Sequence, residues 1–199
     1  MNSKVNKNAI VGASIFCLFG LAAYYVLRKP KHKKQNRFLA ISLGGTHAKI
    51  CVLYQNPNAQ IFTKIGEIRD IETNSPAEFV KYIKDNFDPS TFDYIAIASF
   101  GPLHLRKDNK YGQLIVAPSE QKVKWKGFSL AHELSVLFKK PAHVETDVNA
   151  AAIAEFKLGN FGKINSLAYI TIGTGVGVGL VINGKTVHGF LHPEGGHTV

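Results

Sequence analysis

The sequence predicts an α/β protein, in which one α/β lobe is followed by the beginning of a second. Two observations predict this class. Short apolar runs with the length of strands alternate with amphipathic helical stretches, and glycine-rich turns separate several of them. The composition agrees, because a chain of 199 residues that is 45% hydrophobic and 19% charged is typical of a globular domain rather than a disordered or collagen-like chain.

Three successive antiparallel strands and a helix open the body of the chain. Residues 38–43 and 48–54 are short apolar runs joined by a Gly-Gly turn, and residues 60–68 alternate in polarity. Ser75 is the expected N-cap of the helix that follows, which has a proline in its first turn and is expected over residues 76–86.

The later elements continue the alternation of strand and helix. Apolar runs predict strands at residues 94–100, 143–146, 166–173 and 180–182. Helices are expected at 128–138, where leucines form one stripe, and at 149–158, which is rich in alanine. Asn183 and Gly184 predict a hairpin turn after the last of these strands.

The positive charge is concentrated at the N-terminus. The formal net charge is +10, but residues 1–37 hold eight Lys and Arg and no acid, which leaves 16 basic and 14 acidic residues in the rest. Because the body is nearly neutral, its charge gives no reason to expect a nucleic-acid partner.

Residues 9–27 form an apolar run of 19 residues without a charge. As a helix they would span roughly 28 Å, close to the hydrocarbon core of a bilayer. A cleaved signal peptide and a buried core helix are the alternatives, but the run exits into a basic linker at residues 28–36, which favours a signal anchor. We therefore expect a single-pass membrane anchor with the body in the cytosol, at the mitochondrial outer membrane or the endoplasmic reticulum.

Two cysteines allow at most one disulfide. Cys17 lies in the apolar run and Cys51 in a strand-like run, so both are interpreted as small hydrophobic residues in a reducing compartment. No Cys/His cluster in the sequence makes a complete zinc site.

Two glycine-rich segments are candidate phosphate-binding turns. Gly44, Gly45 and Thr46 lie between two strands, where glycines let backbone N–H groups approach an anion; an ordinary hairpin turn is the alternative. Residues 171–179 place four glycines directly after a buried strand, which indicates the close approach of either a phosphate or another backbone.

Polar residues at two further places are candidates for a site. Asp147 stands between a strand and a helix, where it can be a helix N-cap, a carboxylate that takes a proton from a substrate hydroxyl, or both. Asn149, two positions further on, could donate to or accept from the same ligand. Residues 192–197 hold a carboxylate and two imidazoles. By itself this segment is typical of a surface loop, in which Glu194 could hold a sugar hydroxyl and His197 a sugar or a metal.

Five motifs together resemble the ROK family of sugar kinases, and among them most closely the fructokinases. In order along the chain they are LGGT (43–46), SFGPL (99–103), ETDVNAAAIAE (145–155), YITIGTGVGVG (169–179) and HPEGGH (192–197). The resemblance covers about residues 38–199. It implies the actin-like (ribonuclease H-like) two-lobed ATPase fold, with the second lobe incomplete.

The expected organisation combines this resemblance with the N-terminal run. Residues 1–36 are predicted to be the membrane anchor and basic linker, 37–158 the N-terminal α/β lobe, and 159–199 the start of the second lobe.

The resemblance also implies roles for individual residues. The first phosphate loop of the ATP site would be Gly44, Gly45 and Thr46, and the second would be Gly173, Thr174 and Gly175. Asp147 matches the catalytic base, which activates a sugar hydroxyl for attack on the γ-phosphoryl group of Mg²⁺-ATP. Asn149 and Glu194 match positions near the sugar. His197 matches a ligand of a structural Zn²⁺, and similar kinases form homodimers.

Three positions depart from the family pattern. Ser42 stands where an acidic residue is usual, His47 where lysine is frequent, and His104 where aspartate is usual. The sequence therefore leaves two functions open. One is a kinase that converts fructose to fructose 6-phosphate, and the other is a catalytically impaired sugar-sensing or scaffold protein on the same fold.

Overall fold

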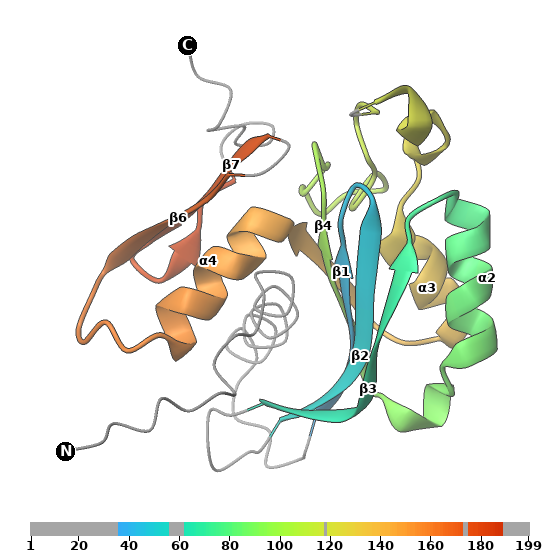
Figure 1. Cartoon of the computed structure of the whole chain (residues 1–199), viewed down its shortest axis with the longest axis horizontal. Coiled ribbons are helices and arrows are strands. Elements are labelled where there is room, and N and C mark those ends of the chain that lie inside the picture. The colour runs from blue at the N-terminus through green and yellow to red at the C-terminus, as the bar shows by residue number, and fades with distance from the viewer. Residues whose placement is uncertain (1–35, 56–61, 118, 173–174, 189–199) are drawn as a thin grey trace.

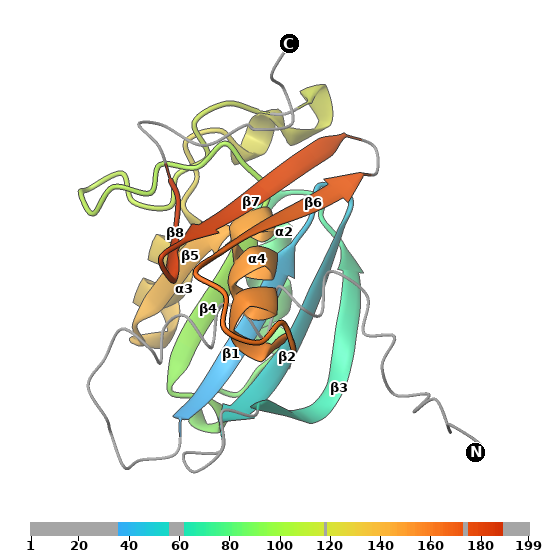
Figure 2. The ribbon, with the colours of Figure 1, turned by 90° about the vertical axis from the view of Figure 1, so that its left-hand side faces the viewer.

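Two β-sheets with one helix between them form the core of the molecule (Figures 1 and 2). The computed structural model describes residues 36–55, 62–117, 119–172 and 175–188. The predicted anchor and the motif at 192–197 lie outside these residues.

The first sheet is mixed and has the strand order β3-β2-β1-β4-β5. Its strands are β1 (Asn36–Leu43), β2 (His47–Gln55), β3 (Phe62–Glu72), β4 (Tyr94–Ser99) and β5 (Ala142–Thr146). The three predicted antiparallel strands are confirmed as β1, β2 and β3, although β3 extends four residues beyond the predicted end. The pairs β1–β4 and β4–β5 are parallel.

Helices α2 (Pro76–Asn86) and α3 (Leu130–Phe138) cover one face of this sheet. Ser75 caps α2 as predicted, and it forms a capping box with Glu78. Helix α3 begins two residues later than predicted because the Ser129 side chain accepts the hydrogen bond of the His132 N–H and caps the helix there. Both helices place apolar side chains such as Phe79 and Leu134 in the core.

Helix α4 (Asp147–Leu158) lies between the two sheets (Figure 2). Ala150 and Ala151 pack against the first sheet, whereas Ala152 and Ile153 pack with Val181 of the second. A helix that must approach a sheet on both sides needs small side chains on both sides. This requirement explains the alanine-rich sequence of α4.

The second sheet has three antiparallel strands, β6 (Ser166–Ile172), β7 (Val176–Ile182) and β8 (Lys185–Thr186). The predicted hairpin turn at Asn183 and Gly184 is confirmed, and both residues have the positive φ that such a turn requires. The elements missed in the sequence are all short: β8 and the 3-10 helices η1 (Pro89–Thr91) and η2 (Glu120–Trp125).

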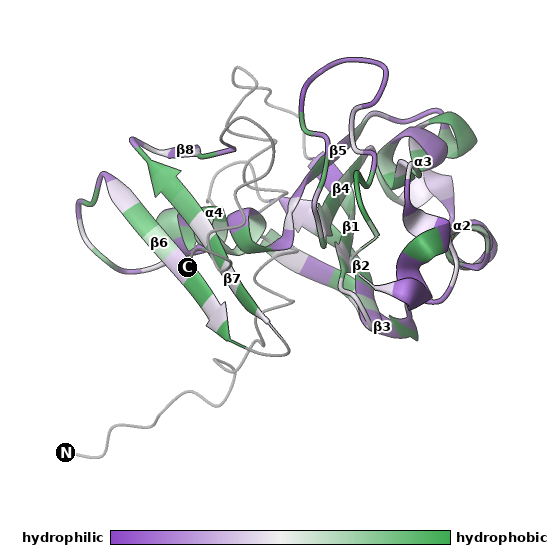
Figure 3. Ribbon diagram, turned by 90° about the horizontal axis from the view of Figure 1, so that it is seen from above, coloured by the Kyte–Doolittle hydropathy of each residue, from purple (hydrophilic) through white to green (hydrophobic). Residues whose placement is uncertain are grey.

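One face of the second sheet carries exposed apolar side chains. Along β6 the inward residues alternate with outward ones, and Ile170 and Ile172 are 60% and 81% exposed. Val176 and Ile182 of β7 are exposed as well, and Figure 3 shows the apolar colour along both strands. An apolar area of this kind is typical of a surface that another protein segment covers.

The membrane localisation predicted from the sequence is corrected by the structure. In residues 36–188, apart from the gaps given above, no helix is both long and apolar enough to cross a membrane. Helix α4, with 12 residues, spans only about 18 Å of the roughly 30 Å that a bilayer core requires. We do not retain the single-pass anchor, whose proposed span at residues 9–27 lies outside the described residues.

The prediction that Cys51 behaves as a small hydrophobic residue is confirmed. It is a free, buried cysteine, and burial raises the pKa of its thiol to about 11. Cys17 lies outside the described residues.

Candidate active site

The carboxyl ends of three parallel strands meet at one edge of the first sheet. Leu43 of β1 pairs with Ser99 of β4, and Ser99 pairs with Thr146 of β5. The residues that follow these ends are therefore neighbours in space, among them Gly44 and Asp147. In open α/β sheets the carboxyl edge is where ligands bind. The register thus brings the first predicted phosphate loop and the predicted base to the same edge.

The first glycine turn is closed by its own backbone. The Gly44 N–H donates to the His47 carbonyl at 3.0 Å, and a Cβ atom on Gly44 would stand 2.7 Å from that oxygen. Gly44 therefore has to be glycine for the turn to close. Around Gly45, in contrast, no atom of the described residues lies within 4 Å of where a Cβ would be, which leaves space among them that a phosphate group could occupy.

Beside this turn, a row of polar side chains crosses one face of the sheet. Ser42 of β1 is opposite Lys49 of β2, and Lys49 is opposite Asp70 of β3. Asp70 accepts hydrogen bonds from Lys49 and, at 3.1 Å, from His47. The Lys49 ammonium, followed by the contribution of His47, holds the pKa of Asp70 below its usual value. His47 and Lys49 thus pair with a carboxylate on β3, whereas Ser42 is buried and uncharged.

Asp147 is the first residue of α4 and is not its N-cap. The Thr146 side chain accepts the hydrogen bond of the Asn149 N–H at 3.1 Å, so Thr146 is the N-cap and that interpretation of Asp147 was wrong. Asp147 is half-buried, and its Oδ1 accepts the Val148 N–H at 2.9 Å. The positive end of the helix dipole favours a negative charge at this position. The Val148 N–H and the N-terminus of α4 therefore stabilise the Asp147 carboxylate at the carboxyl edge of the sheet.

Asn149 is fully buried and joins α4 to the second sheet. Its Oδ1 accepts the Leu180 N–H at 3.0 Å, and its Nδ2 donates to the Val187 carbonyl at 3.0 Å. Both ends of the amide are thus engaged with the backbone. The sugar-binding role of Asn149 remains a prediction, and in this structure the side chain connects the two lobes.

The structure adds a pair between a buried carboxylate and an imidazole that sequence reasoning missed. Glu145 is 1% exposed, and its Oε2 accepts hydrogen bonds from His188 Nε2 at 2.6 Å and from the Thr186 hydroxyl at 3.1 Å. Burial of the carboxyl opposes its ionisation and by itself would raise the pKa of Glu145. The pKa is nevertheless held below its usual value, because His188, the Thr146 N–H and the Thr186 hydroxyl all stabilise the carboxylate. The pair fixes the chain after β8 to the end of β5, two residues before Asp147.

Glu145→Gln is expected to destabilise the fold by about 1.5–3 kcal/mol at neutral pH, the usual contribution of hydrogen bonds to a charged group. Because the folded pKa is lowered, the folded state binds fewer protons than the unfolded state in mild acid. The stabilisation is therefore present above the unfolded pKa of about 4.3 and lost as the pH falls through the folded value. Urea unfolding at pH 7 and at pH 4 measures the difference, with the exposed Glu120→Gln as control. An equal loss of stability at both pH values would contradict the assignment.

In the second glycine segment, the later glycines allow β7 to pack closely against α4. A Cβ on Gly179 would stand 2.1 Å from the Val148 carbonyl oxygen, and one on Gly177 would stand 2.7 Å from Val148 Cγ1. These two glycines let β7 approach α4 closely. At these two positions the glycines therefore accommodate another backbone and not a phosphate, which is one of the two alternatives that the sequence left open. Gly175 lies directly before β7, and no atom of the described residues lies within 4 Å of where its Cβ would be. Gly173 and Thr174 lie outside the described residues.

The remaining predicted site residues, Glu194 and His197, lie outside the described part of the chain. Within the part that the structure describes, no group of three or more His, Cys, Asp and Glu could hold a metal ion. The predicted zinc site therefore stays a prediction.

The model of the ROK family matches residues 38–199 of the chain. A fructokinase from Zymomonas mobilis is 34% identical over 158 residues, which is 78% of this chain and 51% of the relative. A fructokinase from Lactococcus lactis is 36% identical over 159 residues, covering 79% of this chain and 51% of the relative. The chain thus spans about half the length of the curated relatives it matches.

A solved structure shares the fold. The ROK family glucokinase from Streptomyces griseus, in complex with glucose and AMPPNP, superposes with a TM-score of 0.59 at 22% identity, over 80% of this chain and 48% of that chain. At this level of identity the similarity concerns the fold, which is the actin-like α/β fold expected from the sequence.

Proposed function

Because the chain belongs to the ROK family, we propose that the protein is an ATP-dependent hexose kinase and that its substrate is fructose. The observation that carries this proposal is the register of the first sheet, which puts Gly44 and Asp147 at one carboxyl edge. A phosphate-binding turn and a carboxylate at one edge are what phosphoryl transfer to a hydroxyl requires. The two fructokinases described above support the choice of sugar.

Asp147 acts as the general base in this proposal. Its carboxylate takes the proton of the fructose 6-hydroxyl as that oxygen forms a bond to the γ-phosphorus, and the bond from phosphorus to the ADP oxygen breaks. The carboxylate is held by the Val148 N–H and by the helix N-terminus, both of which favour the ionised form that accepts a proton.

The first glycine turn binds phosphate oxygens of ATP. The open space at Gly45 and the hydroxyl of Thr46 suit a phosphate group, and we assign the partner turn to Gly173, Thr174 and Gly175. Mg²⁺ supplies neutralisation of phosphate charge when it is bound. Such a cation usually binds one or two carboxylates together with substrate phosphates, so it needs no dedicated cluster of protein ligands.

The test is hexose-dependent formation of ADP by the protein isolated from its native source. With fructose, glucose and mannose offered separately at equal concentration, we expect the fastest turnover with fructose and a product phosphorylated at the 6-hydroxyl, identified by NMR. Faster turnover with glucose or mannose would contradict the assigned sugar. Sugar binding without any ADP formation would contradict the kinase itself.

A further inference from the structure

Lys122 is a buried lysine without an acidic partner. It lies on η2, is 7% exposed, and among the described residues forms no ion pair. Its ammonium donates a hydrogen bond to the carbonyl of Thr73. Burial lowers the pKa of Lys122. A buried ammonium costs free energy unless an anion or several acceptors surround it, so the fold retains this charge at a cost.

The hydroxyl of Thr73 is an unsatisfied polar group at this place. Thr73 is 1% exposed, and its Oγ1 has no hydrogen-bond partner among the residues that the structure describes. Buried hydroxyls normally have a partner, and an exception calls for an explanation. The Lys122 ammonium thus contacts the carbonyl of the same residue whose hydroxyl has no partner, and it keeps further N–H donors.

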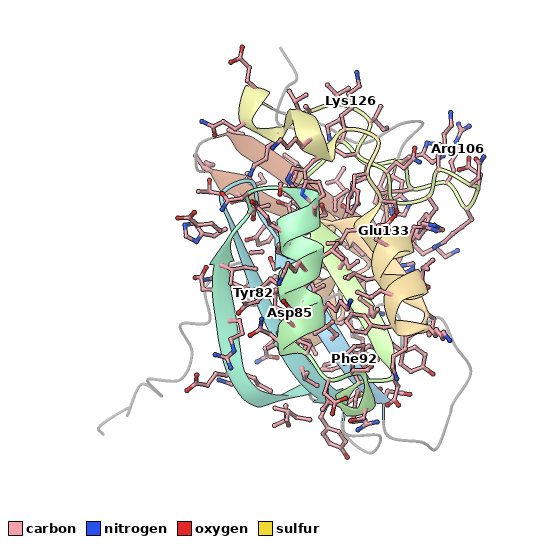
Figure 4. The ribbon with its side chains drawn as sticks, turned by 90° about the vertical axis from the view of Figure 1, so that its right-hand side faces the viewer. Tyr82, Asp85, Phe92, Arg106, Lys126 and Glu133 are labelled. Atoms are coloured by element: carbon pink, nitrogen blue, oxygen red, sulfur yellow. The ribbon has the colours of Figure 1, made fainter. Side chains whose placement is uncertain are left out.

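These two groups adjoin the first glycine turn. The Thr73 N–H donates to the Thr46 carbonyl at 2.8 Å, so the residue that contacts Lys122 also contacts the turn. Trp125 Nε1 donates to the Asn74 carbonyl at 3.0 Å and fastens η2 against the connection between β3 and α2. Figure 4 shows η2, which ends next to Lys126, above the first turn of α2.

We propose that Lys122 and the Thr73 hydroxyl form a phosphate subsite beside the first glycine turn. The ammonium offers further N–H donors, and the hydroxyl offers one O–H, to the oxygens of a phosphoryl group. The negative charge of that group also compensates the buried cation. This inference rests on the proposed kinase function, in which two phosphate-bearing ligands meet at this edge: ATP and the sugar phosphate product.

Trp125 provides a direct readout, because it is the only tryptophan of the chain and lies three residues from Lys122. We would titrate the protein with inorganic phosphate, ATP, fructose 6-phosphate and unphosphorylated fructose and follow its fluorescence. Lys122→Met is expected to weaken the binding of phosphate-bearing probes by about tenfold. Lys124→Met removes an exposed charge from the same turn and is expected to leave binding unchanged. A loss confined to ATP or to fructose 6-phosphate identifies the source of the phosphoryl group.

A second pair of variants tests the hydroxyl without changing the charge. Thr73→Val keeps the shape of the side chain and removes the hydroxyl, whereas Thr73→Ser keeps the hydroxyl. We expect Thr73→Val to weaken phosphate binding and Thr73→Ser to retain it. If Lys122→Met and Thr73→Val both bind all probes as tightly as the parent protein, or the parent binds none, the subsite is overturned. Failure of the kinase proposal is seen separately, as absence of ADP formation by a parent protein that still binds phosphate.

Discussion

Asp147→Asn is expected to lower kcat for fructose phosphorylation by about 10²–10⁴-fold, the usual contribution of a general base. The amide keeps the size of the side chain and can still accept the Val148 N–H, but it cannot take the proton of the sugar hydroxyl. Because the N-cap of α4 is Thr146, the substitution leaves the cap intact. Steady-state kinetics with fructose and ATP measure the effect, and we expect the KM for either substrate to change little.

Asp85→Asn is the matched control for this variant. Asp85 lies on the exposed side of α2, where it pairs with Lys81, far from the carboxyl edge of the sheet (Figure 4). The same chemical change there is expected to leave kcat unchanged. Retained turnover in Asp147→Asn would remove Asp147 from the role of base, provided that both variants unfold at the same urea concentration as the parent protein.

Gly179→Ala is expected to have the largest effect on stability, at least about 3 kcal/mol. Its methyl group would stand 2.1 Å from the Val148 carbonyl oxygen. That oxygen belongs to the backbone of the first turn of α4, so no rotation of a side chain relieves the contact and the second sheet must move away from the helix. Overpacking of this kind usually costs about 1–3 kcal/mol, and a clash with backbone lies at or above the upper end. Urea unfolding followed by far-UV circular dichroism measures the loss.

Gly175→Ala provides the comparison within the same glycine segment. Among the residues that the structure describes, no atom lies within 4 Å of the Cβ that it would add, so we expect a change in the free energy of unfolding below about 1 kcal/mol. If the two substitutions destabilise the protein equally, the close approach of β7 to α4 does not explain the glycine at position 179.

The elements that the sequence predicted well are those with local signals. Ser75 and Pro76 define the start of α2 through contacts within one helical turn. The alternating polarity of residues 60–68 predicted β3, because alternate residues of a strand face opposite sides of the sheet. Errors occurred where two local signals competed. Asp147 and Thr146 are both good N-caps, and the choice of Thr146 depends on how β5 ends.

The candidate site was only partly predictable. Gly44 and Asp147 could be found because each stands directly at the end of an apolar run, where ligand-binding residues are common in α/β proteins. Glu145 and His188 are 43 residues apart, and Lys122 and Thr73 are 49 residues apart. No periodicity connects residues at such separations, so neither pair could be read from the chain.

The sequence by itself determined the alternation of strands and helices, the N-cap of α2 and the glycine turns, because each depends on interactions within a few residues. Only the tertiary structure decided which of these meet. The parallel register of β1, β4 and β5 brings Gly44 and Asp147 to one edge, and the packing of β7 on α4 assigns Gly177 and Gly179 to backbone contact. The physical reason is that register and packing follow from the burial of whole faces, which involves residues far apart in the chain.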